Sequence, residues 1–196
     1  MIGTVIISTP AAYGIARKKI KGVTVFLFVV LIIQMFPSNM MALPLFAMFT
    51  HMRLTDTYLG VILANMTISI PFCILVLRTF FLSMPKDLEN AALIDGCTNW
   101  GTFFKIILPL SQTGITTCAT FSFLFAWGEF IYSLILLNSK DLWPITVGMR
   151  GFVGQHGTSW GELMAISVVS SLPIILIFVF TLRYIISGIT AGAVKE

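Results

Sequence analysis

MPKDLENAALIDGCTNWGTFFKIILP, residues 84–109, is the stretch that decides how this chain is organised. It is too polar to cross a lipid bilayer and too apolar to be a simple loop. Long apolar blocks precede and follow it. A structured, amphipathic segment between two membrane spans usually faces the water. We therefore interpret it as a docking surface for a soluble partner.

The pattern of this stretch predicts two short helices joined by a tight turn. Pro85 followed by Asp87 and Glu89 is typical of a helix start, because proline fits the first turn and acids favour its positive end. Gly96 permits a turn that most residues resist, and Thr98 or Asn99 can cap the next helix. The apolar positions, partly at helical spacing, are Leu88, Ala91, Ala92 and Ile94, then Trp100, Phe103, Phe104, Ile106 and Ile107. We expect helices over residues 88–95 and 98–107.

Composition indicates an all-α membrane protein that crosses the bilayer several times. Hydrophobic residues make up 57% of the 196 residues, charged residues only 10%, and mean hydropathy is +0.97. Ordinary soluble domains contain about 25% charged residues. The apolar blocks are continuous rather than alternating, which argues against a transmembrane β-barrel. The three cysteines have no metal-site spacing, so we expect buried or half-buried thiols and no metal.

Five apolar blocks predict about five transmembrane helices in a single membrane domain. The first is short, because 16 residues rise only about 24 Å against a hydrocarbon core of about 30 Å. We interpret it as the inner end of a helix whose outer end is missing from this chain. Pro37 and Pro44 interrupt the second block, and Pro71 kinks the third. The blocks are residues 1–16, 23–49, 58–82, 115–137 and 162–186.

The distribution of lysine and arginine residues predicts the orientation of the chain in the membrane. If the segment around Lys18 is cytoplasmic, nine basic residues fall inside and three outside. The opposite topology reverses this ratio, so the positive-inside rule selects the first arrangement. It places residues 84–109 and the tail 187–196 in the cytoplasm, and the loop 138–161 outside. The net charge of +4 is explained in this way and does not argue for nucleic acid.

The spacing within residues 84–109 resembles the EAA loop of binding-protein-dependent ABC importer permeases. Ala91-Ala92, Gly96 and then Ile106-x-Leu108-Pro109 match that pattern. Further similarity to the maltose-type, carbohydrate-uptake branch covers most of the chain. It lies in PAAYGIAR (residues 10–17), IDG (94–96), AWGEF (126–130) and TAGAVK (190–195).

This resemblance implies the type I ABC importer permease fold and a role in carbohydrate or polyol uptake across the inner membrane. The chain has no P-loop, so we do not expect it to be an enzyme. ATP and Mg²⁺ are expected on a partner, a cytoplasmic ABC ATPase dimer. A second homologous permease and an extracytoplasmic solute-binding protein complete the implied assembly. The coupling residues it implies are Glu89, Asn90, Ala91, Ala92, Asp95, Gly96, Ile106, Leu108, Pro109, Thr190, Gly192, Val194 and Lys195.

The chain departs from the family pattern in two ways. The position of the family's glutamate, which the resemblance pairs with the ATPase, holds Asn90, and Glu89 stands one residue earlier. A one-residue step turns a side chain about 100° around a helix. Maltose-type permeases also have six spans, whereas this chain has four and a part. A fragment, a split gene or a truncated gene model would each explain that.

Other candidates lie in the apolar blocks and the outer loop. Gln34, Asn39, Asn65 and Glu129 could line a translocation path, because polar groups inside spans are functional candidates; helix–helix hydrogen bonding is the alternative. In the outer loop, the resemblance suggests contact with a binding protein through Phe152, Gln155, His156 and Trp160. Two other functions stay open. One is an ion-coupled secondary transporter, and the other a truncated membrane protein that does not transport.

Overall fold

The computed structural model describes residues 1–18, 20–154 and 157–193 and is almost entirely helical. The long helices are α1 (Ile2–Arg17), α2 (Val23–Met35), α3 (Ala42–His51), α4 (Tyr58–Ser83), α8 (Gln112–Trp127) and α11 (Trp160–Ala193). The short elements are η1 (Ser38–Met41), α5 (Asp87–Ile94), α6 (Asn99–Thr102), the π-helical turn η2 (Phe103–Ile107), α7 (Leu108–Leu110), α9 (Ile131–Leu136), η3 (Lys140–Leu142), α10 (Ile145–Gly148) and η4 (Met149–Phe152). Strands β1 (Val153–Gly154) and β2 (Gly157–Thr158) pair antiparallel.

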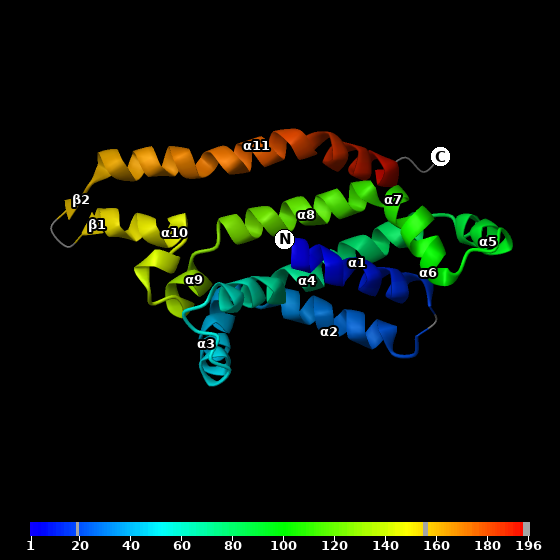
Figure 1. Cartoon of the computed structure of the whole chain (residues 1–196), viewed down its shortest axis with the longest axis horizontal. Helices are drawn as coiled ribbons and strands as arrows, with labels where there is room; N and C mark the ends of the chain where they lie inside the picture. The colour runs from blue at the N-terminus through cyan, green and yellow to red at the C-terminus, as the bar shows by residue number, and fades with distance from the viewer. Residues whose placement is uncertain (19, 155–156, 194–196) are drawn as a thin grey trace.

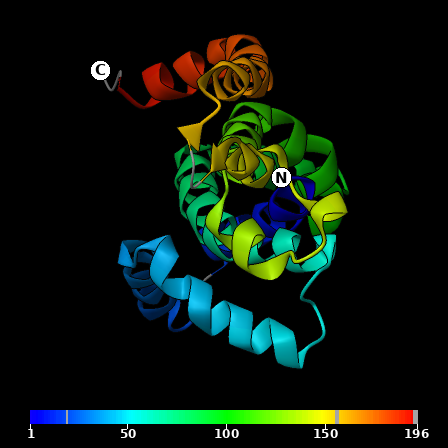
Figure 2. The same cartoon turned by 90° about the vertical axis from the view of Figure 1, so that its left-hand side faces the viewer.

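Apart from α3, which is bent by 98° from α2, the long helices run lengthwise and place the short elements at two opposite ends of the molecule (Figure 1). One end carries α9, α10 and the β1–β2 hairpin. The other carries α5, α6, α7 and the connection between α1 and α2. Viewed along the long axis, α1, α4 and α8 cluster in the middle, and α11 packs against α8 on one side (Figure 2). The segment of residues 84–109 therefore forms one end of the molecule.

Small residues allow α1 to pack closely along α4. Thr4, Ser8, Thr9 and Ala12 are the buried residues of α1. The hydroxyl groups of Thr4 and Ser69 hydrogen-bond at 3.0 Å across the two helices. Short side chains and interhelical hydrogen bonds are the usual means of association in lipid, where apolar contact alone gives little driving force.

A buried cluster connects α1, α4 and α8 with η2. Its members are Ala12, Cys73, Leu77, Phe81, Phe103, Ile107 and Cys118. Cys73 and Cys118 are buried free thiols and Cys97 is half-buried, which confirms the prediction for the cysteines. A second cluster, at the opposite end, joins α3 and α4 to α9 through residues such as Phe49, Ala64 and Tyr132. The two clusters fix both ends of α4.

All five predicted apolar blocks contain helices, and they differ in length. Within the described residues, α4 and the part of α11 from Trp160 to Leu182 are long and apolar enough to cross a membrane. The segments Val23–Met35 and Ser38–His51 qualify only as a pair, bent by 98°. Pro37 explains the bend. The residue before a proline avoids helical geometry, and Phe36 accordingly has an extended backbone. Helices α1 and α8 have 16 residues each.

Candidate functional site

The turn between α5 and α6 is fixed by its own backbone. Gly96 has φ +84°, in the left-handed region where side chains are strained. The Gly96 N–H donates to the Leu93 carbonyl and the Cys97 N–H to the Ala92 carbonyl. This is the Schellman pattern that closes a helix C-terminus. Thr98 begins α6 by accepting a hydrogen bond from the Gly101 N–H at 3.1 Å, so the predicted helix–turn–helix is confirmed.

The second half of the segment enters the core through a π-helical turn. Thr102, Phe103 and Ile107 are buried, while Phe104 and Lys105 on the other side are exposed. π-helical turns are rare and occur often at functional sites, because the extra residue re-aims the side chains around it. Here the turn directs Phe103 and Ile107 into the cluster with α1 and α4. The two short helices are thus fixed to the long ones.

A charged pair joins α5 to the end of α1. Arg17 Nε lies 2.5 Å from Glu89 Oε1, and the two side chains are only 7% and 16% exposed. The second oxygen of Glu89 accepts a hydrogen bond from the Tyr13 hydroxyl at 3.0 Å. Arg17 also donates to the carbonyl oxygen of Met84, in the connection between α4 and α5, at 3.0 Å. Charged groups this far from water require such partners, so Glu89 is committed to internal contacts.

Tyr13 extends this connection to the second short helix. Its ring packs on Phe81 of α4, with ring centroids 5.5 Å apart, and on Phe103 at 4.9 Å. Aromatic pairs at such distances add to the stabilisation from burial alone. Tyr13 and Arg17 are four residues apart and lie on one face of α1. The sequence analysis included both residues only within the stretch PAAYGIAR and did not predict their contact with Glu89.

The outer surface of α5 is left exposed. Asn90, Ala91, Leu93 and Asp95 are exposed, and Ile94 is 85% exposed. Of the predicted apolar face, only Ala92 is buried; Leu88 and Ala91 are not, because the core contact of this helix passes through Glu89. Asn90 and Glu89 therefore face different surroundings, as the one-residue step predicts.

The remaining predicted coupling residues fall in three places. Ile106 and Leu108 are half-buried, and Leu108 packs against the cluster that contains Phe103. Pro109 is exposed at the start of α7. Thr190 and Gly192 lie in the helical backbone of α11, in a part whose side chains are not described. Val194 and Lys195 lie outside the described residues.

Glu129, a predicted path residue, caps α9. Its carboxylate oxygens accept hydrogen bonds from the backbone N–H groups of Tyr132 at 2.6 Å and Ser133 at 3.0 Å, and from the Ser133 hydroxyl at 2.8 Å. A negative charge at this position satisfies free N–H groups and the positive end of the helix. Asn39 and Glu129 border one hollow of about 300 Å³, together with Ser38, Phe125 and Phe130.

The other two path candidates have different positions. The Gln34 amide donates to the Ile68 carbonyl at 3.1 Å, which fastens α2 to α4, and Gln34 lines a smaller neighbouring hollow that shares Ser38. The Asn65 amide donates to Val61 in its own helix, and the residue is buried near Ser69. The structure thus brings Gln34, Asn39 and Glu129 around two adjoining hollows and places Asn65 deeper in α4.

At the same end of the molecule, Asp56 holds two loops together. Its carboxylate accepts hydrogen bonds from the N–H groups of Asn138 and Ser139, each at 2.9 Å, and from the Ser139 hydroxyl at 2.6 Å. These bonds, chiefly those from Ser139, hold the Asp56 pKa below its ordinary value. Phe152 is half-buried and Trp160 is exposed, whereas Gln155 and His156 lie outside the described residues.

Comparison with known proteins assigns the family. The model for the binding-protein-dependent transport system inner membrane component matches residues 5–193. The chain belongs to this family. The chain is similar to the arabinooligosaccharides transport system permease protein AraQ of Halalkalibacterium halodurans, with 36% identity over 192 residues. That match covers 98% of this chain and 68% of the relative.

Further relatives agree with this assignment. The trehalose/maltose transport system permease protein MalG of Thermococcus litoralis is 35% identical, over 98% of this chain and 69% of MalG. The probable permease protein YurM of Bacillus subtilis is 37% identical, and the match covers 64% of its length. The chain thus spans about two thirds of these permeases. A bacterial ABC transporter that imports the acidic polysaccharide alginate has the same fold, with TM-score 0.78 and 22% identity, over 94% of this chain and 70% of that one. The predicted permease fold is confirmed.

Proposed function

We propose that this permease is the membrane subunit of an ABC importer for a carbohydrate or polyol. It would form half of the translocation path and couple it to ATP hydrolysis on a separate ATPase dimer. The names of the relatives, which include permeases for arabinooligosaccharides and for trehalose and maltose, support this solute class. A second permease and an extracytoplasmic binding protein complete the proposed assembly in the inner membrane, with the tail and residues 84–109 in the cytoplasm.

The observation that carries this proposal is the combination of an exposed tip and a rigid base. The tip is the exposed surface of α5 formed by Asn90, Ala91, Leu93, Ile94 and Asp95. The base is the connection of α5 and α6 to α1 and α4 through Arg17, Tyr13 and Phe103. Motion of a partner passes through packed elements and not through a loose loop. A partner that moves the tip would therefore move the ends of α1 and α4.

The ATPase contact follows from the positions of Glu89 and Asn90. Because Glu89 is paired with Arg17, it would hold the tip of α5 against α1 and would not contact the ATPase itself. The outward contacts would come from the Asn90 amide, the Asp95 carboxylate and the apolar surface of Leu93 and Ile94. The tail residues Thr190, Gly192, Val194 and Lys195 are proposed as a second contact to the ATPase pair.

The solute path is proposed at the hollows near Asn39. Phe125 and Phe130 offer apolar surface, and Asn39 and Ser38 offer hydrogen-bonding groups. Carbohydrate sites combine such groups, because a sugar ring has apolar faces and a hydroxyl rim. At the same end of the molecule, Phe152, Gln155, His156 and Trp160 are the proposed contacts to the binding protein.

Co-purification tests the proposed partnership. The tagged chain is expressed in its own host, extracted in mild detergent and analysed for an ABC ATPase by mass spectrometry. Ile94→Asp places a charge on the tip and should reduce the recovered ATPase at least tenfold. Val153→Asp is the matched control, because Val153 is also exposed (56%) but lies in β1 at the opposite end. Equal losses in both variants, or no ATPase with the unmodified chain, would contradict the proposal.

A further inference from the structure

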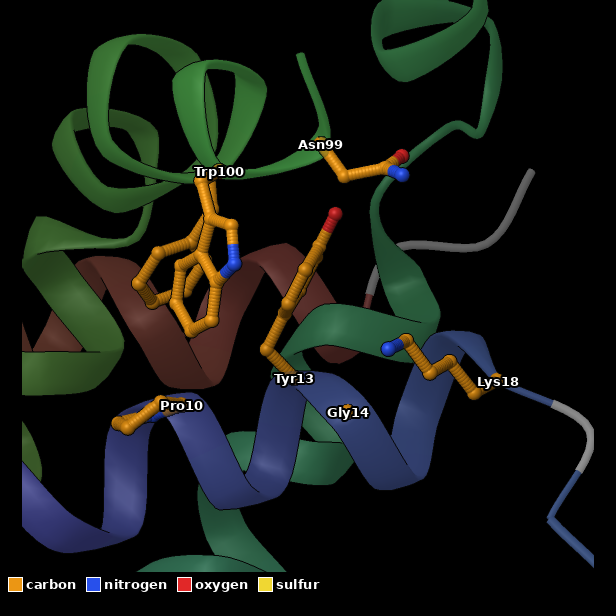
Figure 3. Close-up of a pocket in the computed structure, with 7 residues that line it drawn as sticks. Pro10, Tyr13, Gly14, Lys18, Asn99 and Trp100 are labelled. Atoms are coloured by element: carbon orange, nitrogen blue, oxygen red, sulfur yellow. The ribbon is translucent and has the colours of Figure 1, made fainter.

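A hollow of about 130 Å³ lies between the end of α1 and the start of α6 (Figure 3). Tyr13 rises from α1 toward Asn99, and Trp100 extends from α6 toward α1. Lys18 directs its amino end back along α1 toward Tyr13. The lining residues are Pro10, Tyr13, Gly14, Lys18, Asn99, Trp100 and Phe103. Tyr13 and Phe103 also belong to the rigid base proposed above, but the coupling role assigns no ligand to this hollow, and the exposed tip of α5 lies elsewhere in the segment.

The lining offers hydrogen-bond donors and a positive charge. The Lys18 ammonium, the Asn99 amide and the Trp100 indole N–H are all donors. None of the seven lining residues is acidic. The neighbouring carboxylate of Glu89 bonds to Tyr13 and is neutralised by Arg17. The hollow is thus suited to an anion with several acceptor oxygens, such as a phosphate group.

One wall of the hollow is open because it contains glycine. A Cβ atom added to Gly14 meets no other atom within 4 Å. Pro10 and Ile7 continue the same face of α1 away from Lys18, since they precede Gly14 by four and seven residues. Both residues are exposed. An apolar track therefore leads from the hollow along α1.

Exposed aromatic rings border the hollow. Trp100 is 67% exposed and stacks with exposed Phe104, with ring centroids 6.0 Å apart. Tryptophan beside lysine at the end of a membrane helix is typical of the boundary between hydrocarbon and headgroups. Basic pockets on the cytoplasmic side of membrane helices bind the headgroups of anionic lipids. The position of the hollow and the donors that line it both favour an anionic lipid as its ligand.

We propose that this hollow binds the phosphate of an anionic phospholipid from the cytoplasmic leaflet. The phosphate oxygens accept hydrogen bonds from Lys18, Asn99 and Trp100, and an acyl chain follows Pro10 and Ile7. This inference rests on the cytoplasmic placement of residues 84–109 proposed above. The bound lipid contacts α1 and α6 together, so it reinforces the connection between them.

Native mass spectrometry of the full chain tests the site. The chain is purified without partners and titrated with phosphatidylglycerol, with phosphatidylcholine as the neutral comparison. Lys18→Gln should weaken the binding of the first phosphatidylglycerol molecule about fivefold, which is the effect of one basic residue near an anionic surface. The binding of phosphatidylcholine should be unchanged. Lys21→Gln is the matched control, because Lys21 is exposed and does not line the hollow. Equal weakening by both variants would overturn the proposal.

Filling the hollow provides an independent test. Gly14→Leu should abolish the tight binding of phosphatidylglycerol. Gly14→Ala, which has room for its Cβ atom, should retain it. Thermal unfolding of both variants in lipid-free detergent confirms that they are folded, and if Gly14→Leu fails, the titration uses Gly14→Val. Millimolar inorganic phosphate should not displace the lipid; displacement would show a site for the free ion instead. Because no ATPase is present, these results are separate from the co-purification result.

Discussion

Arg17 Nε lies 2.5 Å from Glu89 Oε1, and this contact joins the end of α1 to α5, the first short helix of the segment 84–109. The two residues are 72 positions apart in the sequence. Tyr13 and Met84 complete the connection through hydrogen bonds. The pair connects α5, with its exposed tip, to α1. It also explains why Glu89 does not point toward the water.

Glu89→Gln should destabilise the protein by about 3 kcal/mol, because a largely buried ion pair that loses one partner leaves the other charge uncompensated. Thermal unfolding in detergent measures this change. Asn90→Ala, one residue further along the same helix, should have little effect because Asn90 is exposed. The double variant Arg17→Glu with Glu89→Arg should recover part of the loss. If Glu89→Gln is as stable as the unmodified chain, the pair does not hold α5.

Gly96→Ala should cost about 1 kcal/mol, because φ +84° is unfavourable for a residue with a side chain. The Cβ atom itself would meet open space, so strain is the only cause. Gly148→Ala is the matched control, since Gly148 has equal space and helical backbone angles. Chemical denaturation in detergent compares the two. Equal effects would show that the turn is not strained by a side chain.

The Asp56 carboxylate should stabilise the two loops that it joins, around residues 56 and 139, in a pH-dependent way. Its pKa is lowered in the folded protein, chiefly by hydrogen bonds from Ser139. The stabilisation is therefore present above the ordinary carboxyl pKa of about 4 and is lost as pH falls through the lower, folded pKa. The melting temperatures of the unmodified chain and Asp56→Asn should differ by a constant amount from pH 7 to about pH 5 and converge at lower pH. A difference that does not depend on pH would contradict this role.

Glu129→Ala should destabilise α9 by about 1 kcal/mol, because two backbone N–H groups lose their acceptor. Glu129→Gln retains one side-chain oxygen and should lose less. Hydrogen exchange of the amides of Tyr132 and Ser133 measures the effect locally, and faster exchange is expected in the order unmodified, Gln, Ala. Unchanged exchange in Glu129→Ala would contradict the capping role of the carboxylate.

The local features of the segment 84–109 could be predicted from sequence, because they depend on neighbours in the chain. Gly96 at the turn is such a feature and was expected, and Thr98 was one of the two expected caps, with Asn99 as the alternative. The buried side of α5 could not be predicted in this way. Of its five apolar residues only Ala92 is buried, and the contact that positions the helix is a charged pair with a distant helix. A carboxylate on a surface segment gives no sequence signal for that partner.

The same limit applies at the opposite end of the molecule. Glu129 was a candidate for the translocation path because an acid within an apolar block is unusual. Its actual hydrogen bonds are to α9, three and four residues later, and this cap spacing was a signal available in the sequence. The contact between Asp56 and Ser139 joins loops 83 residues apart. No local pattern indicates it, because both residues are common in polar turns.

Site-specific crosslinking tests the central claim, that the tip of α5 docks on an ATPase, most directly. Ile94→Cys and Val153→Cys are placed in a background in which the native cysteines are replaced by serine or alanine. Each is treated in membranes with a short bifunctional thiol reagent, and adducts are identified by mass spectrometry. We predict an adduct between position 94 and an ABC ATPase, and none from position 153. An ATPase adduct at position 153, or none at position 94 while the ATPase co-purifies, would contradict the account.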